Sequence, residues 1–261
     1  MKSKPSFTWI CKPDSGKGGE GIFLAENFKQ IPVNLYNNKS QNLLVQRYIK
    51  TPLLVDKKKF DLRLYVLIKG FNPIEAYLCD EGLARFCTEN HQVPTAGNLK
   101  NMFMHLTNFN LNKNSENYVQ PDEDFLEEGK DTGSKRLLSS LWETLEEDGH
   151  DVDTIQEKIK DTVRKAIISM EPYLYHYYRK DITKNDDKIA ASKVFHILGL
   201  DVLIDRKFNA WLMEVNSNPS LNIFLERDIP GRPGETERVL QELDKHVIAK
   251  VVTETIRIVC N

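Results

Sequence analysis

Two carboxylates and an amide near the C-terminal end of the chain have residue types and a spacing that suit a metal ion. Asp201, Glu214 and Asn216 fall in two strand-like segments, 200–205 and 210–216, which we expect to form a β-hairpin. Side chains two residues apart on a strand share a face, so Glu214 and Asn216 point to the same side. Hard oxygen ligands suit Mg2+, which is often shared with nucleotide phosphates. A surface hairpin with solvated acids is the alternative.

The register of this hairpin follows from its turn. With 206–209 as a four-residue turn, Asp205 pairs with Ala210, and counting back along both strands places Asp201 opposite Glu214. Directly opposed side chains lie about 5 Å apart on one face of a sheet. Two carboxylates at that distance repel each other, which favours a cation between them.

A glycine-rich stretch, 14–21, separates two strand-like segments, 7–11 and 22–24. From Gly16 to Gly21 it matches the G-x-G-x-x-G pattern of dinucleotide-binding folds. That motif must open a helix, however, whereas here it leads into a strand, so the match is weak. The backbone N–H groups of such a loop can surround phosphates. A plain flexible hairpin remains equally compatible with the pattern.

Several single polar residues accompany this loop and the acidic hairpin. Lysine acts on phosphate as a point charge, and arginine binds phosphate or carboxylate through two hydrogen bonds. Each cation alone is more typical of a solvated surface, but together they suggest a nucleotide clamp. The residues are Lys12, Lys17, Lys59, Arg63 and Lys113. His105 lacks an assignable serine or cysteine partner, so a structural histidine is favoured over a catalytic one.

An alternating strand must position part of this set. Phe60 to Ile68 alternates for nine residues, which places the even-numbered apolar side chains on one face and Asp61 and Arg63 on the other. Residues 74–79 are the expected hairpin partner.

Helical periodicity dominates the second half of the chain. An apolar stripe at steps of three and four runs from Val152 to Met170 and predicts a helix that ends near Pro172. Its basic face, Lys158 to Lys165, is more typical of a solvated surface than of a binding surface. A terminal helix is predicted with Val239, Leu243, Val247 and Val251 on one stripe. The polar segment 110–135 reads as a surface loop. Helices among antiparallel hairpins indicate an α/β or α+β fold.

Composition excludes some classes of protein. The chain has 261 residues, 36 basic and 38 acidic side chains, and a formal net charge of -2, so it is not a globally basic nucleic-acid binder. Its 40% hydrophobic content is that of a globular protein. No apolar run approaches the roughly 18 residues of a membrane span. The four scattered cysteines predict free thiols rather than disulfides or a zinc site.

Five motifs in order resemble the tubulin tyrosine ligase-like family. They are Lys12-Pro13-Asp14 with the glycine loop, Gln46-Arg47-Tyr48-Ile49, Lys59-Phe60-Asp61-Leu62-Arg63, Met104-His105-Leu106-Thr107-Asn108, and Glu214-Val215-Asn216 followed by Asn218-Pro219-Ser220. The tract Ser134-Lys135-Arg136 with Gly149-His150 is most similar to the polyglutamylase branch.

The resemblance implies an α+β chain with the ATP-grasp fold, in which ATP lies between two mainly antiparallel sheets. Residues 1–47 would be the remainder of a central subdomain with the phosphate loop. Residues 48–261 would be the C-terminal subdomain with the Mg2+ site and a mobile loop at about 110–135. The N-terminal domain and the start of the central subdomain are expected to be missing, so the chain alone is expected to be impaired in activity.

The resemblance also implies a role for each matching residue. Arg63 and Glu214 are assigned to catalysis, Arg63 by neutralising charge as the phosphoryl group moves. The residues assigned to Mg2+ are Asp201, Glu214 and Asn216. Those assigned to ATP are Lys12, Glu20, Gly21, Gln46, Arg47, Tyr48, Ile49, Lys59, Phe60, Asp61, Thr107 and Asn108. Those assigned to the incoming amino acid are Arg85, which would hold its carboxylate, with Phe109, Asn110 and Lys113.

The activity implied is ATP- and Mg2+-dependent addition of free L-glutamate to glutamyl side chains of the acidic tubulin tail, mainly as chain elongation. Phe109 stands where relatives commonly have tyrosine, and the loop Lys17-Gly18-Gly19-Glu20-Gly21 lacks a glutamine and a cation found in many glutamylases. Glycine or tyrosine addition therefore stays open, as do a non-catalytic microtubule-binding module and an ATP-grasp enzyme for small molecules. A monomer at the cytoplasmic cytoskeleton, including the cilium or basal body, is expected, with neither nucleic-acid nor membrane partners.

Overall fold

The computed structural model describes residues 7–14, 18–32, 42–70, 73–121, 132–181, 194–229, 231–232 and 234–260. Lys17 and Gly16 of the glycine-rich stretch lie outside the described residues.

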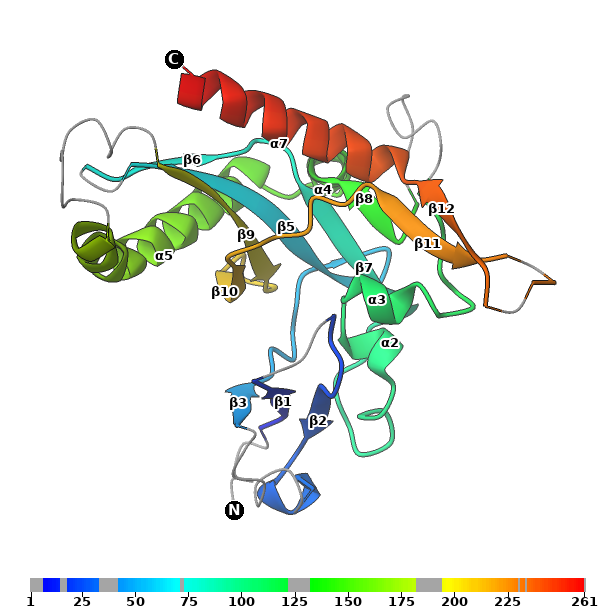
Figure 1. Cartoon of the computed structure of the whole chain (residues 1–261). Helices are drawn as coiled ribbons and strands as arrows, with labels where there is room; N and C mark the ends of the chain where they lie inside the picture. Colours follow the sequence, from blue (N-terminus) through cyan, green and yellow to red (C-terminus); the bar gives the residue numbers. More distant parts are fainter. Residues whose placement is uncertain are drawn as a thin grey trace, which may run out of the picture.

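A small antiparallel sheet is formed by the first part of the chain. Strand β1 (Trp9–Pro13) lies between β2 (Phe23–Ala25) and β3 (Leu43–Arg47), and the short helix η1 (Phe28–Gln30) follows β2. The glycine-rich stretch therefore joins two paired strands, as its sequence pattern predicts. This sheet and the C-terminal helix lie at opposite ends of the molecule (Figure 1).

The larger sheet has seven strands in the order β10-β9-β5-β7-β8, with β4 and β6 also paired to β5. The strands are β4 (Leu54–Val55), β5 (Lys58–Lys69), β6 (Glu75–Leu78), β7 (Leu83–Asn90), β8 (Lys135–Leu137), β9 (Phe195–Ile204) and β10 (Ala210–Asn216). The predicted alternating strand and its hairpin partner correspond to β5 and β6. The last strand of the small sheet ends at Arg47, and the first strand of the larger sheet begins at Leu54.

A third sheet consists of β11 (Phe224–Asp228) and β12 (Thr236–Leu240). These strands form an arm that extends away from the larger sheet (Figure 1). This arm was not predicted from the sequence. Val239 was expected in the terminal helix and lies in β12 instead, because helix α7 (Glu242–Cys260) begins three residues later.

Five helices complete the described structure, and the longest corrects one prediction. They are α2 (Met102–His105), α3 (Phe109–Asn112), α4 (Leu138–Glu147), α5 (Val152–Asp181) and α7. Helix α5 continues past Pro172, where the sequence predicts its end. An internal proline costs about 3 kcal/mol. Beyond it, Leu174 packs against the core and Tyr178 is buried, which offsets that cost.

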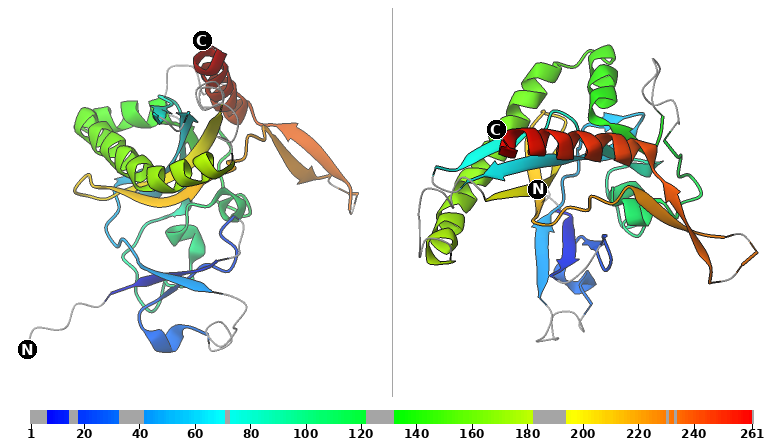
Figure 2. Two further views of the ribbon diagram at one scale, coloured as in Figure 1. Left: turned by 60° about the vertical axis from the view of Figure 1, so that its left-hand side comes forward. Right: turned by 45° about the horizontal axis from the view of Figure 1, so that its top comes forward.

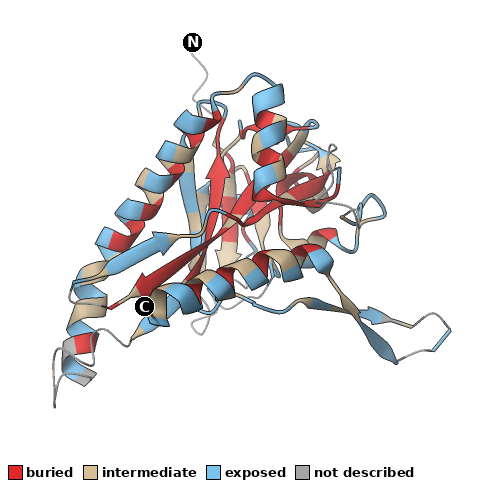
Figure 3. Cartoon of the chain, turned by 90° about the horizontal axis from the view of Figure 1, so that it is seen from above, coloured by how far each residue is buried: buried red, intermediate tan, exposed pale blue. Residues whose placement is uncertain are grey.

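Strand β5 has two chemically different faces. Its even-numbered side chains, Phe60 to Ile68, are buried against α4 and α5 in the main core. On the other face, Tyr65 packs under α7 with Leu243 and Val247, and Lys69 donates a hydrogen bond to a carbonyl of α7. Figure 3 shows β5 buried between the helices, and α5 with one buried and one exposed side. The remaining part of this second face, with Asp61 and Arg63, is left free for the site.

The observed architecture is α+β, with every strand pair in the described part of the chain antiparallel. Of the predicted loop 110–135, the first residues belong to α3, Lys135 is buried in β8, and residues 122–131 lie outside the described residues. The four cysteines are free. None of the helices in the described ranges combines the length and hydrophobicity needed to span a bilayer.

Core packing by α5 predicts a large difference between two isoleucines of this helix. Ile155 is fully buried, whereas Ile168 is 64% exposed. Ile155→Ala leaves a cavity beside β5 and is expected to lower the free energy of unfolding by about 2–5 kcal/mol. Ile168→Ala, the matched control, is expected to change it by less than about 0.5 kcal/mol. Denaturant titration measures both, and equal losses would contradict the assigned helix orientation.

Candidate nucleotide and metal site

A cavity of about 1000 Å3 lies between the small sheet and the larger sheet. Figure 2 shows the two sheets from two further sides. Strand β1, the glycine loop, β5, β7, the segment 105–113 and the β9–β10 hairpin all contribute to its walls. Most of the residues assigned from sequence line it: Lys12, Glu20, Lys59, Asp61, Arg63, Arg85, Thr107, Asn108, Phe109, Asn110, Lys113, Asp201, Glu214 and Asn216.

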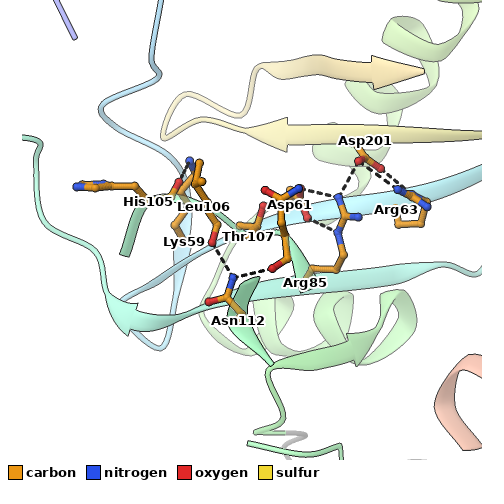
Figure 4. Close-up of polar contacts among 10 residues, drawn as sticks. Lys59, Asp61, Arg63, Arg85, His105, Leu106, Thr107, Asn112 and Asp201 are labelled. Atoms are coloured by element: carbon orange, nitrogen blue, oxygen red, sulfur yellow. Dashed lines mark hydrogen bonds and ion pairs between the residues drawn. The ribbon is translucent and has the colours of Figure 1, made fainter. Parts of the chain in front are cut away.

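Four charged residues on three adjacent strands form a continuous ion-pair network in the cavity wall (Figure 4). Arg63 pairs in register with Asp201 of β9, and Asp61 pairs in register with Arg85 of β7. Arg63 donates to both carboxylate oxygens of Asp201, with Nε–Oδ1 at 2.6 Å and Nη2–Oδ2 at 3.2 Å. Arg85 donates to Asp61 at 2.8 and 2.7 Å and reaches Asp201 Oδ2 at 2.9 Å.

The network sets the charge of its members. Burial would raise the pKa of Asp201, but the charges of Arg85 and Arg63 hold it below its ordinary value. Burial would likewise lower the pKa of Arg85, but Asp61 and Asp201 outweigh it, so the pKa is raised. Thr107 Oγ1 donates to Asp61 at 2.7 Å. The charged forms of Asp201 and Arg85 are therefore stabilised by neighbours within this chain.

Arg85 is already engaged by two carboxylates of this chain. Its Nε and Nη2 both donate within the network, whereas no hydrogen bond from Nη1 is found among the described residues. The role implied by the resemblance, binding the carboxylate of the incoming amino acid, would therefore use Nη1.

The acidic hairpin places Asp201 opposite Glu214, as predicted, but not through the predicted register. Ala210 pairs with Ile204 rather than with Asp205. An irregularity between Leu212 and Glu214 then shifts the register by one residue and restores the pairing of Asp201 with Glu214. Asp205 instead binds the turn, accepting hydrogen bonds from the backbone N–H groups of residues 207 and 209.

These three residues fit a divalent cation in their donor chemistry. Glu214 is exposed to the cavity and has no ion pair among the described residues, whereas the carboxylate of Asp201 is shared with two arginines. Asn216 would offer its amide oxygen as a ligand, while its Nδ2 atom, which can only donate, is buried with no hydrogen-bond partner among the described residues. No cluster of three or more His, Cys, Asp or Glu side chains occurs in the described residues, so any site here depends on the amide as the third ligand.

The glycine loop is packed directly onto the segment 108–110. Gly18, Gly19 and Gly21 all have positive φ, a conformation that favours glycine. A Cβ atom on Gly18 would lie 2.3 Å from Asn110 Nδ2, and one on Gly19 would lie 2.8 Å from Asn108 Cγ. Only bare backbone fits there, which suits a loop whose N–H groups contact phosphate. Burial lowers the pKa of Lys12 despite the nearby charge of Glu214, so groups from both sheets face one another across the cavity.

Hydrogen bonds to two residues hold the side chain of Lys59 in place. Its Nζ donates to the carbonyl of His105 at 2.7 Å and to the hydroxyl of Tyr48 at 3.2 Å. His105 Nε2 lies 3.1 Å from the carbonyl of Asn98, which can only accept, so Nε2 carries the proton and Nδ1 accepts from Tyr48 at 3.3 Å. His105 is a fully buried structural residue, as favoured from sequence.

Other residues assigned to the nucleotide do not line the cavity. Phe60 lies on the opposite face of β5, 1% exposed against Phe86, so its side chain does not reach the site. Tyr48 is buried beneath Lys59, and Arg47 is exposed with its guanidinium over Phe7. Gln46, Ile49 and Gly21 also lie outside the lining, although Gly21 is flanked by lining residues.

The structure adds residues that the sequence analysis missed. Asn112 is 1% exposed, accepts hydrogen bonds from the N–H and hydroxyl of Thr88, and donates to the carbonyls of Leu106 and Asn108. It thereby fixes the segment that carries Thr107 and Asn110. The only sequence feature that indicates a role for Asn112 is its position in the polar segment directly before Lys113.

A partly buried ion pair in the cavity lining joins β8 to α7. Lys135 binds Asp244 at 2.5 Å, and its Nζ lies 4.3 Å from the centre of the Phe109 ring. Tyr118 packs edge-on against the same ring. Nothing local in the sequence points to Asp244, because it lies on α7, more than a hundred residues from Lys135.

Comparisons with known proteins agree with these motifs. The family model described as "Tubulin-tyrosine ligase family" matches residues 1–230. The chain is 41% identical over 219 residues to tubulin polyglutamylase ttll6 from Danio rerio, covering 84% of this chain and 26% of that protein. It is 40% identical over 255 residues to tubulin polyglutamylase TTLL11 from Homo sapiens, covering 98% and 34%. A probable beta-tubulin polyglutamylase from Tetrahymena thermophila is 39% identical over 82% of this chain and 17% of its own length. The chain thus spans about a third or less of these relatives.

His105 predicts a pH dependence of stability. Burial lowers its pKa from 6.5 to about 4, so between these values the unfolded chain binds a proton that the folded chain does not. The free energy of unfolding should therefore fall as pH drops from 6.5 towards 4, by up to about 1.4 kcal/mol per pH unit. Burial also lowers the pKa of His91, which adds to the same slope.

Denaturant titration at several pH values tests this. His105→Gln should be less stable at pH 7 and should have a shallower pH slope, whereas His176→Gln, at an exposed position of α5, should retain the original slope. An unchanged slope in His105→Gln would contradict the buried neutral state.

Proposed function

The chain belongs to the tubulin-tyrosine ligase family, and from that premise we propose that it acts as an ATP- and Mg2+-dependent tubulin polyglutamylase. The observation that carries the proposal is the placement of Asp201 and Glu214, paired across two strands, in a cavity whose opposite wall carries Lys12 and a bare glycine loop. A Mg-nucleotide requires oxygen ligands for the metal on one side and, on the other, cations and a glycine-rich loop that can bind its phosphates. ATP would lie between the two sheets, as in ATP-grasp enzymes.

The reaction proposed has two steps. The γ-phosphoryl group of ATP is transferred to a side-chain carboxylate of an acceptor glutamate, forming an acyl phosphate and ADP. The α-amino group of free glutamate then attacks the acyl carbon, an isopeptide bond forms, phosphate leaves with the bonding electron pair, and the amine loses a proton. Repetition on the added glutamate elongates the chain. Such phosphoryl transfer depends mainly on positioning and charge stabilisation.

The residues of the cavity would divide this work. Lys12 and Lys59 provide fixed positive charges for the phosphates. Asp201, Glu214 and Asn216 would hold Mg2+, which neutralises phosphate charge when bound. Arg63 lies beside Asp201 and can offset the negative charge of the moving phosphoryl group.

The amino-acid end of the cavity would bind glutamate. The free Nη1 of Arg85 would contact the α-carboxylate, with Asn110 and Lys113 nearby. Phe109 offers a ring rather than a hydroxyl, and the cation of Lys135 lies over that ring. Lys113, whose cation has no ion pair among the described residues, favours an acidic amino acid over glycine or tyrosine, which stay the alternatives.

An acidic tubulin tail needs a positive surface, for which the sequence offers the basic face of helix α5, Lys158 to Lys165, or a segment outside this chain. Lys160 pairs with Glu157, and Arg164 and Lys165 both pair with Asp161 on the same helix. These three cations of α5 are therefore largely neutralised, whereas Lys12 and Lys113 in the cavity have no ion pair among the described residues and are better placed to attract the tail. Association with the cytoskeleton, including the cilium or basal body, is part of the proposal.

Mass spectrometry of tubulin tests the activity and its amino acid together. Tubulin is incubated with the protein, Mg-ATP and an equal mixture of glutamate, glycine and tyrosine. Mass increments of glutamate that disappear without ATP are expected. Mass increments of glycine or tyrosine would support a ligase activity but contradict the assignment to the polyglutamylase branch. Binding of tubulin without any mass change would favour a non-catalytic module.

Replacement of the exposed acid tests the metal assignment. Glu214→Gln keeps the shape but loses the charge that holds a divalent cation. Turnover of Mg-ATP should fall by more than the roughly 10- to 100-fold typical of groups that only orient metal ligands. The thermal midpoint should be unchanged, since Glu214 is exposed. Glu146→Gln, an exposed acid of α4, is the control. Turnover by Glu214→Gln at the control's rate would refute the assignment.

A further inference from the structure

Strand β11 has one edge that is not paired with another strand. In the described part of the chain it pairs only with β12. Hydrogen bonds from Gln241 N–H to the Ile223 carbonyl, and from Ile229 N–H to the Glu235 carbonyl, fix which residues face β12. In an antiparallel ladder these residues alternate, so the main-chain groups of residues 223, 225, 227 and 229 point to β12. Those of 224, 226 and 228 point the other way.

The contacts of Phe224 agree with this alternation. Both its N–H and its carbonyl bond the side chain of Asn222, at 3.1 and 2.8 Å. The amide of Asn222 thus occupies the first outward position of the edge in the way a neighbouring strand would. The next outward position is Glu226, whose main chain has no comparable partner among the described residues. An edge of this kind is a template for an added strand.

This open edge borders the cavity. Asn222, Phe224, Leu225 and Glu226 belong to the same cavity lining as Arg63, Arg85 and Glu214. Figure 2 shows the arm extending from the side of the molecule, so that it reaches out of the body into solvent. A chain bound along β11 would therefore run from solvent to the site.

We propose that the acceptor polypeptide binds in extended conformation as a third strand on the open edge of β11, through main-chain hydrogen bonds at Glu226. The inference rests on the proposed function, because it identifies the occupant as the acceptor tail. Such strand addition takes affinity from the main chain and selectivity from alternate side chains. One side chain of the bound segment would then enter the cavity.

The charge of the arm argues for recognition through the main chain. Glu226 is exposed and acidic and would repel a glutamate-rich tail, but Arg238 lies directly opposite it on β12 and offsets that charge, so the side chains here give the tail little net attraction. The neighbouring Arg227 is paired with Glu237 and adds little net positive charge. A second copy of this chain would cover the edge without supplying a side chain for the site, whereas the acceptor must supply one.

Two substitutions of Glu226 distinguish the contribution of its main chain to peptide binding from that of its side chain. Glu226→Pro removes the outward N–H but no hydrogen bond to β12, and proline is tolerated at such edge positions. Glu226→Pro should weaken binding of a glutamate-rich synthetic peptide about fivefold, because the loss of one hydrogen bond changes affinity by about that factor. Glu226→Gln, the matched control, keeps the N–H and removes the repelling charge, so it should bind the peptide as tightly as the original chain or tighter. Fluorescence anisotropy measures both, and thermal unfolding establishes that both variants fold.

Peptides modified in their own main chain test the same inference without altering the protein. N-methylation of successive peptide residues, one at a time, should weaken binding at every second position, because alternate N–H groups face β11. Equal binding by Glu226→Pro and Glu226→Gln, or an N-methyl series without alternation, would overturn the proposal. Concentration-dependent self-association lost in Glu226→Pro would also overturn it, by showing that a second copy covers the edge.

These measurements use neither ATP nor free glutamate. If the alternation is found but no amino acid is transferred to tubulin, the proposed activity fails and the docking edge stands. If transfer occurs and the Glu226 variants bind alike, the activity stands and the docking edge fails.

Discussion

The site depends on a buried row of alternating charges across three neighbouring strands. Arg63 faces Asp201, Asp61 faces Arg85, and Arg85 joins the two pairs. Burying such charges is costly, and apolar residues of similar volume are often as stabilising. A row of this kind beside an open cavity therefore points to chemistry rather than to stability. It also holds Asp201 ionised and oriented, next to the exposed carboxylate of Glu214.

This row of charges can form because the two faces of β5 lie in different environments. One face is apolar and buried under α4 and α5, which anchors the strand in the main core. The other face changes along its length, from the charged residues of the cavity to Tyr65 under α7. The charged side chains thus project from a strand whose position is set by packing on its other side. Preorganised charge of this kind is what electrostatic stabilisation of a reaction requires.

The cavity is assembled from parts that are far apart in the sequence. The small sheet brings Lys12 and the glycine loop, while the segment held by Asn112 closes over that loop through Asn108 and Asn110. Lys135 and Asp244 join β8 to α7 in another part of the lining, and the lining continues onto β11. Nucleotide, amino acid and acceptor would thus each meet a different wall of one cavity.

The sequence by itself determined the features that depend on local periodicity. The two faces of β5, the β5–β6 hairpin, the strands around the glycine loop and the buried stripe of α5 all follow from steps of two or of three and four residues. The ordered motifs also identified the family and most of the cavity lining. The pairing of Asp201 with Glu214 came out correctly, although a bulge near Met213 was needed to produce it.

Only the tertiary structure decided which distant residues meet. The order of strands in the sheet places Arg63 beside Asp201 and Asp61 beside Arg85, and no local pattern encodes that order. The same holds for Lys135 with Asp244, for Tyr48 as a support of Lys59, and for the open edge of β11. Local backbone preferences act over a few residues, whereas these contacts form only when the packing of the whole chain brings its segments together.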